Sequence, residues 1–176
     1  MIVIKKEEEA IEIILEQKPL LLFQAKGELG PRALGNRSIL FDPRNKDVQK
    51  IINTIKKREW WRPVAGTVLI EHVKDYFDMM HLKESPYMAY AIEAKEKAKL
   101  QVPGIVHVDG TCRIQTLKEE DNSKYYSLIN AFYKKTGVPI LCNTSLNLAG
   151  YPIIENLKQL KEITKTTEFK NVYLPW

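Results

Sequence analysis

The sequence predicts an α/β (α+β) domain in which helices flank a twisted, mixed sheet. Amphipathic segments of helical period alternate along the chain with short apolar runs of strand character. A length of 176 residues suits one well-packed core and is short for two. No internal repeat, low-complexity tract or Gly/Pro-rich linker divides the chain, so residues 1–176 are expected to form a single domain.

The first third of the chain predicts two helices around a buried strand. An amphipathic helix is expected over Glu7–Glu16, ended by Pro19, and an apolar strand follows over Leu20–Gln24. Asp47 is expected to cap a second helix, whose apolar stripe begins at Val48 and recurs every three to four residues.

The middle of the chain is richer in strand signals. Val64–Ile70 and Met88–Ala94 have strand character, the second by alternation of apolar residues. Ile105–Val108 and Cys112–Thr116 flank the dipeptide Asp109-Gly110, which is typical of tight hairpin turns. These two segments are therefore expected to pair as a β-hairpin.

The last third predicts two more helices and two more strands. A helix is expected over Ser123–Lys135, stopped by Gly137, and a strand over Pro139–Asn143. A final helix over Asn156–Thr164 and a short strand over Val172–Leu174 complete the chain. The topology of the sheet does not follow from periodicity.

The composition is that of an ordinary globular protein with a mild basic excess. Lysine and arginine total 27 against 22 aspartates and glutamates, a net charge of +5 that suits small polyanionic ligands at least as well as nucleic acid. No stretch approaches the ~20 apolar residues of a membrane span. Met1–Glu9 lacks the apolar block of a signal peptide, so a cytoplasmic protein is expected.

Cysteine and histidine are scarce. Cys112 and Cys142 are too few and too far apart for a metal knuckle or a disulfide framework, and we expect inert, buried thiols. His107 and Asp109 can share one face as metal ligands. With only three histidines and no carboxylate cluster nearby, no metal site is expected.

A glycine- and arginine-rich segment, Lys26–Ser38, directly follows the first predicted strand. Its Arg32, Arg37 and Ser38 are candidate phosphate ligands, because arginine forks match phosphate geometry and glycines let the backbone approach a ligand. The spacing fits neither the P-loop nor the dinucleotide fingerprint. A glycine-rich turn with solvated arginines explains the same composition equally well.

Basic residues and two tryptophans gather in Lys56–Pro63, at the end of the second predicted helix. Charge that complements the helix dipole, together with core aromatics, is the ordinary explanation. This explanation accounts well for Lys57 but poorly for Lys56, Arg58 and Arg62. The dipeptide Arg62-Pro63 lies beyond the helix, so it cannot complement the dipole at the helix end. These three cations are therefore candidates for an anion site.

Two further segments offer ligand contacts. Arg113 alternates with apolar neighbours in a predicted strand, so it is expected to be partly buried, and a buried arginine rarely lacks an anion. Asn143, Thr144 and Ser145 form a polar turn after a predicted strand. Their side chains can satisfy that turn, or they can bind a phosphate or a planar amide.

Several catalytic classes lack their usual residues in this chain. We find no Ser/His/Asp spacing of the hydrolase type, no paired carboxylates in a cleft motif and no thiol with a basic neighbour. The residues that recur in the unusual segments are arginine, lysine and small side chains that donate hydrogen bonds. These groups stabilise phosphoryl and acyl-phosphate groups by charge and placement.

Five segments, in order and over nearly the whole chain, resemble the C-terminal, YrdC-like domain of the O-carbamoyltransferases related to nodulation protein NodU. They are Glu28–Arg44 (ELGPRALGNRSILFDPR), Lys56–Pro63 (KKREWWRP), Ser85–Met88 (SPYM), His107–Thr116 (HVDGTCRIQT) and Thr136–Asn147 (TGVPILCNTSLN). The string GPRALGNRS is highly specific, and five ordered matches leave little room for chance.

The resemblance implies a fold and a reaction. The fold is a YrdC-like twisted sheet with one open, positively charged cavity. There carbamoyl phosphate is split, and the carbamate is joined to the α-phosphate of ATP, supplied with Mg²⁺, as carbamoyl-adenylate. A second domain, which holds iron through histidines and aspartates, passes the carbamoyl group to an acceptor hydroxyl.

The resemblance also implies roles for single residues. The residues expected to act in catalysis are Lys56, Arg58, Arg113 and Ser145. The three cations would neutralise phosphate charge, and the serine would orient the carbamoyl group or adenosine. Those expected to bind substrate and ATP are Arg32, Arg37, Ser38, Arg62 and Asn143. Asn143, like Ser145, is expected to orient the carbamoyl group or adenosine.

The chain departs from the family pattern in places. Leu146 and Tyr151 replace residues that the family usually has as Phe and Glu, and Val64 replaces an aromatic, changes that could relax the pocket or mark lost activity. The match begins within about ten residues of Met1, so the iron ligands and the acceptor site are expected on a separate partner chain.

Two other functions stay open from the sequence. One is an RNA-binding module, since related YrdC-like domains serve tRNA modification and Trp60 and Trp61 can stack on bases. It is disfavoured because the basic residues gather in loops rather than along a stripe. The other is a catalytically inactive regulatory subunit.

Overall fold

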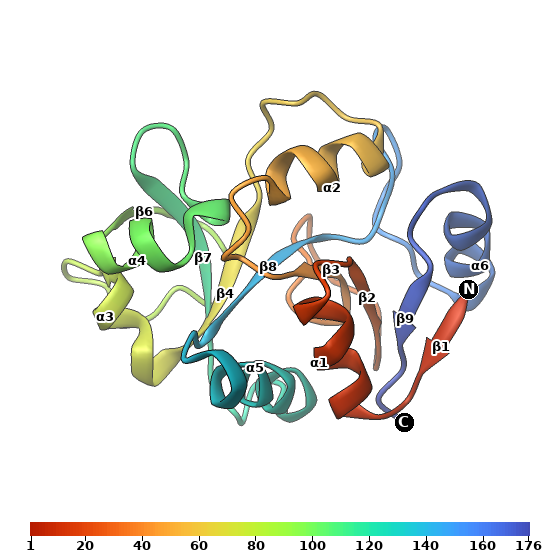
Figure 1. The fold of residues 1–176 in the computed structure, drawn as a ribbon, viewed down its shortest axis with the longest axis horizontal. Helices are drawn as coiled ribbons and strands as arrows, with labels where there is room; N and C mark the ends of the chain where they lie inside the picture. The colour runs from red at the N-terminus through yellow and green to blue at the C-terminus, as the bar shows by residue number, and fades with distance from the viewer.

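The computed structural model describes all residues, 1–176, as a mixed sheet with flanking helices (Figure 1). The helices are α1 (Glu7–Leu15), α2 (Val48–Lys56), α3 (Val73–Tyr76), α4 (Glu96–Gln101), α5 (Ser123–Thr136) and α6 (Leu157–Thr166), with 3₁₀ turns at Ile70–His72 and Pro103–Ile105. The strands are β1 (Ile2–Ile4), β2 (Leu20–Phe23), β3 (Arg37–Phe41), β4 (Ala65–Leu69), β5 (Phe77–Asp78), β6 (Ala91–Ala94), β7 (Thr111–Leu117), β8 (Ile140–Ser145) and β9 (Asn171–Tyr173). The predicted fold class is confirmed.

The nine strands form one sheet in the order β1-β9-β2-β3-β8-β4-β7-β6-β5. The pairs β1–β9, β9–β2 and β4–β7 are parallel, and the other five are antiparallel. Strand β8 lies at the centre, where Asn143 is opposite Leu40 of β3 and Ala65 of β4. Polar residues at the end of β8 are therefore framed by two strands and held by their ladders.

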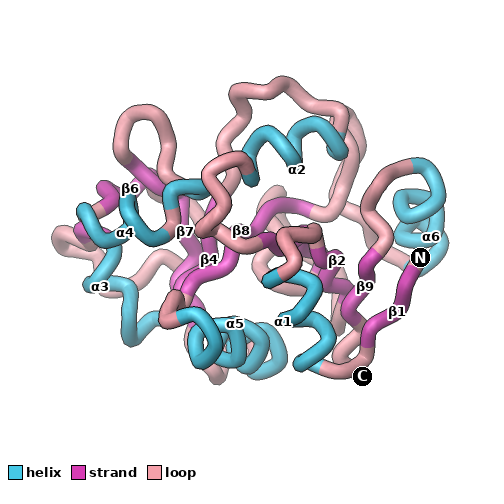
Figure 2. Tube along the Cα trace, in the orientation of Figure 1, coloured by secondary structure: helices cyan, strands magenta, loops and turns pink.

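The helices cover both faces of this sheet (Figures 1 and 2). Helices α1 and α5 pack side by side on one face, and α2 lies across the other, close to the ends of β4 and β8. The apolar face of α5, formed by Tyr125, Leu128, Ile129 and Phe132, is fully buried. Gly137 ends α5 in the left-handed conformation, as the sequence predicts.

Two local predictions are wrong. Asp47 does stand before α2, but its side chain makes no capping hydrogen bond. Ile105–Val108 does not pair with Cys112–Thr116, because β4 and β6 take both sides of β7; a proline-initiated 3₁₀ turn ends at Ile105. Asp109-Gly110 makes only a tight turn between His107 and Thr111, and the antiparallel partner of β7 is β6.

Three smaller expectations are refined. Strand β8 continues to Ser145, so residues 143–145 are extended strand and not a turn. Cys112 and Cys142 are buried free thiols, as expected, and burial raises the pKa of each to about 12. None of the helices combines the length and apolar character needed to cross a membrane.

Candidate active site

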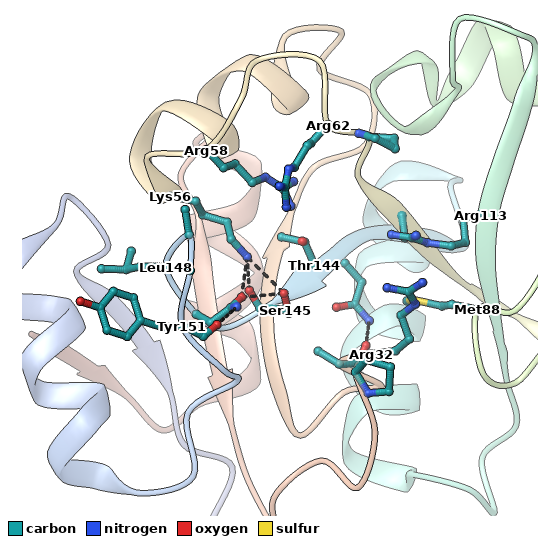
Figure 3. Close-up of a pocket in the computed structure, with 18 residues that line it drawn as sticks. Arg32, Lys56, Arg58, Arg62, Met88, Arg113, Thr144, Ser145, Leu148 and Tyr151 are labelled. Atoms are coloured by element: carbon teal, nitrogen blue, oxygen red, sulfur yellow. Dashed lines mark hydrogen bonds between the residues drawn. The ribbon is translucent and has the colours of Figure 1, made fainter.

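A basic cavity of about 360 Å³ opens where the end of α2, the end of β8 and the loop before β3 meet (Figure 3). Five of its 18 lining residues are cationic, and no aspartate or glutamate is among them. The cationic residues are Arg32, Lys56, Arg58, Arg62 and Arg113. Such an excess of positive charge in a partly enclosed site attracts anions strongly.

Lys56, the last residue of α2, points its ammonium group at the end of β8 (Figure 3). Its Nζ donates to the carbonyl oxygen of Ser145, to Ser145 Oγ at 3.2 Å and to Asn147 Oδ1 at 3.0 Å. Burial lowers the pKa of Lys56 to about 7, and the positive charge of Arg58 adds to the shift. Lys56 therefore changes charge near neutral pH.

Arg58 is held in place by Asn53, a residue of α2 that sequence reasoning missed. Asn53 Oδ1 accepts from Arg58 Nε, while Asn53 Nδ2 donates to the carbonyl oxygens of Trp60 and Arg62, both at 2.9 Å. One side chain thus fixes the guanidinium and the backbone on either side of Trp61. Burial lowers the pKa of Arg58 to about 10, and its Nη2 is buried without a partner.

Arg113 and Arg32 approach the cavity from opposite sides, and Figure 3 shows their guanidinium groups near one another. Arg113 Nε is buried and has no hydrogen-bond partner. Burial, followed by the charge of Arg32, lowers the pKa of Arg113. Neither arginine forms an ion pair with a carboxylate, so both retain their charge for a ligand.

Arg62 lies at the exposed mouth of the cavity. Its Nε is 2.7 Å from Glu59 Oε2, and each side chain of this pair is about half exposed. Surface pairs of this kind are weak, so an incoming polyanion can compete for the guanidinium.

Asn143 lies at the base of the cavity, with none of its surface exposed. Its Nδ2 donates to the Ala33 carbonyl at 3.1 Å and to Thr67 Oγ1 at 3.0 Å, and Gln115 Oε1 is 3.4 Å away. Its Oδ1 has no partner. Asn143 therefore holds a buried hydrogen-bond acceptor without a partner at the base of the cavity.

Ser145 and Asn147 form a small network on the wall that Lys56 reaches. Ser145 Oγ donates to Asn147 Oδ1 at 2.7 Å, and Asn147 Nδ2 donates to the Tyr151 carbonyl at 2.6 Å. The Ala149 amide donates to the Lys56 carbonyl at 3.1 Å. These bonds hold residues 147–151, all of which line the cavity, beside Lys56 and Ser145.

The structure does not bring Arg37 and Ser38 into this cavity. Arg37 begins β3 and is 3% exposed; its guanidinium donates to the carbonyls of Gln24 and Glu155 and stacks 3.7 Å from the Phe23 ring. Ser38 is fully buried and accepts from the Gly35 amide at 3.1 Å. The sequence prediction misplaced both because it did not foresee β3, whose pairing with β2 and β8 buries them.

The loop that carries Arg32 is held by its own side chains. One Glu28 carboxylate oxygen accepts from the amides of Leu34, Asn36 and Arg37 at 2.9–3.0 Å, so this carboxylate serves the loop and not the cavity. Gly35 has a φ of +101°, and a side chain there would overlap the Tyr125 ring. The fold of the loop therefore explains Gly35, and Arg32 is the charged residue of this segment that lines the cavity.

A second hollow, of about 910 Å³, lies on the other side of the same loop. It shares Pro31 and Arg32 with the basic cavity and extends to the start of α5 at Asn122–Lys124. Arg32 thus stands at the boundary between the two hollows.

Other catalytic groups are sparse. No three histidine, cysteine, aspartate or glutamate side chains converge as metal ligands. His107 contacts Thr111 Oγ1 at 3.2 Å and the Val64 carbonyl at 3.3 Å, and Asp109 Oδ1 accepts from Thr111. What the cavity can do chemically is neutralise, orient and desolvate a phosphate-bearing ligand.

Comparison with known proteins identifies the family to which the chain belongs. Residues 11–175 match the family described as "Carbamoyltransferase C-terminus". Nodulation protein NolNO of Sinorhizobium fredii is 43% identical over 149 residues, covering 82% of this chain and 22% of that protein. Nodulation protein NolO of Bradyrhizobium diazoefficiens is 40% identical over 147 residues, covering 82% of this chain and 27% of that protein. The chain thus spans about a quarter of the length of these curated relatives.

Among solved structures, full-length HypF in the phosphate- and nucleotide-bound form superposes with a TM-score of 0.66 at 18% sequence identity. The match covers 97% of this chain and 25% of HypF, and it shows that the fold is shared. The YrdC-like sheet expected from the sequence is confirmed by this likeness. The match over 165 of the 176 residues shows that the chain belongs to the carbamoyltransferase C-terminus family.

Proposed function

We propose that this chain activates carbamoyl phosphate with ATP, making a carbamoyl-adenylate that a transferase domain passes to an acceptor hydroxyl. The observation that carries the proposal is the basic cavity, in which five cations and no carboxylate surround one free amide oxygen. Carbamoyl phosphate and ATP both carry negatively charged phosphate groups, which these cations would neutralise. A protein that shares the fold, HypF, has been crystallised with phosphate and nucleotide bound, which supports the choice of ligands.

The proposed reaction has two steps. Carbamoyl phosphate is hydrolysed to carbamate and phosphate; a carbamate oxygen then attacks the α-phosphorus of ATP. The bond from that phosphorus to the bridging oxygen breaks, and pyrophosphate leaves. Little covalent chemistry is asked of the protein, so charge stabilisation and placement provide the catalysis.

The residues divide into charge carriers and orienting groups. Lys56, Arg58 and Arg113 lie deep enough to neutralise phosphate oxygens in a site of low dielectric. Arg32 and Arg62 are exposed and suit the outer phosphates of the nucleotide. The amide of Asn143 and the hydroxyl of Ser145 are placed to orient the carbamoyl group.

Magnesium would reach the cavity with the nucleotide. The lining holds no carboxylate, so the ion's oxygen ligands would come mainly from the phosphates and from water. Mg²⁺ would then add to the charge neutralisation that the cationic side chains supply.

Transfer to the acceptor would need an iron-binding domain outside these residues. Trp60 and Trp61 are 79% and 58% exposed and lie between Arg58 and Arg62, which both line the cavity. An exposed apolar border at the mouth of a site suits a partner domain that excludes water from a hydrolysable mixed anhydride. We propose that this border contacts the transferase domain.

The test is ATP–pyrophosphate exchange that depends on carbamoyl phosphate. Labelled pyrophosphate should enter ATP only when chain, Mg²⁺ and carbamoyl phosphate are all present. If pyrophosphate never enters ATP although both substrates bind, the chain is a regulatory subunit and the catalytic proposal is wrong.

RNA binding is a second candidate, favoured by one observation. The two exposed tryptophans, which lie between Arg58 and Arg62 in the sequence, can stack on unpaired bases. A single-stranded RNA that quenches tryptophan fluorescence at physiological salt, and that ATP does not displace, would favour this function over the first.

A further inference from the structure

The free oxygen of Asn143 has an orientation that its neighbours fix. Asn143 Nδ2 faces the carbonyl oxygen of Ala33, which can only accept. The Thr67 hydroxyl donates to Gln115 Oε1 at 2.9 Å, so its oxygen must accept from Asn143. Gln115 Nε2 in turn donates to the Leu34 carbonyl at 3.2 Å, which fixes the orientation of that amide as well. Turning the Asn143 amide over would set oxygen against oxygen, so Oδ1 is the atom left without a partner.

Among the buried side-chain atoms of the lining, this oxygen is the one acceptor without a partner; the other two unpaired atoms, on Arg58 and Arg113, are donors. Lys56, Arg58 and Arg113 offer only N–H groups, and the other amide oxygen of the lining, Asn147 Oδ1, already accepts from Lys56 and Ser145. A buried acceptor without a partner costs free energy that a ligand donor can recover. The lining therefore fits a ligand that brings both negative charge and an N–H group.

The acceptor and the cations are spaced along one strand. Asn143 and Ser145 are two residues apart in β8, so their side chains leave the same face about 7 Å apart. Lys56 Nζ binds at the Ser145 end, 3.2 Å from Oγ. A small molecule with a phosphate at one end and an amino group at the other can span these two positions.

We infer that Asn143 Oδ1 accepts a hydrogen bond from the amino group of carbamoyl phosphate and so selects carbamoyl phosphate over acyl phosphates that lack an N–H. This inference rests on the proposed function, and it adds the residue that sets the acyl specificity. Acetyl phosphate carries a methyl group where carbamoyl phosphate carries NH₂, and it would leave Oδ1 buried and unpaired. A site built around a hydrogen bond rejects an analogue that lacks the donor much more strongly than a merely apolar pocket does.

The first experiment compares ligands on the unaltered chain. Calorimetry with carbamoyl phosphate, acetyl phosphate and inorganic phosphate should give a dissociation constant at least about ten-fold lower for carbamoyl phosphate than for acetyl phosphate. Equal affinity for the two acyl phosphates overturns the inference. Because this experiment needs no variant, equal affinity would overturn the inference even if substitutions at Asn143 fail to fold.

The second experiment removes the oxygen. In Asn143→Ala the preference for carbamoyl over acetyl phosphate should fall to about two-fold or less, while inorganic phosphate binds within about three-fold of the unaltered chain. Asn45→Ala is the matched control, since Asn45 is a partly buried asparagine whose amide contacts Gln17, outside the cavity. Retention of the full preference in Asn143→Ala overturns the inference.

A third comparison excludes the other amino group that the proposed substrates carry, on the adenine of ATP. If Asn143→Ala abolishes a preference for ATP over inosine triphosphate and leaves the acyl preference unchanged, Oδ1 binds the base and the inference is wrong. The proposed function fails separately: if the chain prefers carbamoyl phosphate but never exchanges pyrophosphate into ATP, the specificity stands and the adenylation does not.

Discussion

The ammonium group of Lys56 lies 3.2 Å from the hydroxyl oxygen of Ser145, in a cavity that contains no carboxylate to balance its charge. Burial lowers the pKa of this lysine to about 7. The cation is thus present below neutral pH and is lost as the pH rises, unless an anion binds and stabilises it.

Anion affinity should therefore fall as the pH rises through 7. Sulfate is the suitable probe, because it stays a dianion and Lys56 then contributes the change of charge. Calorimetry at pH 6 and pH 8 should show weaker binding at pH 8, with proton uptake by the protein on binding. Lys56→Met should bind sulfate more weakly at both pH values and lose most of this pH dependence. A flat profile in the unaltered chain would show that Lys56 keeps one charge state throughout.

Arg113→Ala should weaken ATP binding by at least ~1.5 kcal/mol, the scale of a hydrogen bond to a charged group. The reason is that Arg113 Nε is buried without a protein partner, and no carboxylate competes for its guanidinium. Titration calorimetry measures the change, with Lys97→Ala as the control for the loss of one charge, since Lys97 pairs with Asp75 outside the cavity. Unchanged affinity would remove Arg113 from the site.

Lysine at position 58 or 32 should not restore the function of the arginine that it replaces. Arg58 needs one nitrogen for Asn53 and others for a phosphate, and a single ammonium group cannot serve both directions at once. Arg58→Lys and Arg32→Lys should each lower pyrophosphate exchange at least about ten-fold, with thermal unfolding close to that of the unaltered chain. Near-normal exchange in both variants would show that charge alone is sufficient.

Asn53→Ala should disturb the site by releasing its neighbours. It leaves the Trp60 carbonyl with one remaining donor, Gln49 Nε2, and it frees Arg58 Nε. We expect a loss of about 1–3 kcal/mol in the free energy of unfolding, measured in urea. We also expect weaker ATP binding at a temperature where the variant is fully folded. Full ATP affinity in the folded variant would mean that Asn53 stabilises α2 without positioning Arg58.

Complete carbamoyl transfer should require the iron-binding domain. Purified chain, ATP, Mg²⁺, carbamoyl phosphate and a panel of hydroxylated acceptors should consume ATP slowly and give no stable O-carbamoylated product, by mass spectrometry. Such a product in that mixture would place an acceptor site within residues 1–176. The second hollow beyond Arg32 would then be the first place to look.

The spacing of apolar residues predicted the longer helices well, because each of them buries one side. Helix α5 and its Gly137 stop follow from an apolar stripe and one residue that tolerates a positive φ. The hairpin at Asp109-Gly110 failed for a non-local reason. Turn propensity acts over four residues, whereas β7 is paired by β4 and β6, which lie far from it in sequence.

The charged part of the site was predictable, and its polar supports were not. Arg58 and Arg113 stand out in sequence because a partly buried cation needs an anion. Asn53, Thr67 and Gln115 each look like an ordinary polar residue in an apolar element. Only the packing shows that they fix Arg58 and Asn143. The signal available from sequence was weak. Thr67 is the one polar side chain of β4, Gln115 shares β7 with other polar residues, and Asn53 adjoins the buried stripe of α2.

The double role of Asn53 gives the protein a built-in optical reporter. Its oxygen binds Arg58 and its nitrogen binds the carbonyl of Trp60. We therefore predict that a phosphate bound by the guanidinium also shifts the backbone of this exposed tryptophan. Ligand occupancy should then register in the intrinsic emission of the native chain without any dye. The Asn53 side chain links the cavity to Trp60, so the binding of different substrates can be compared by tryptophan fluorescence before any product is assayed.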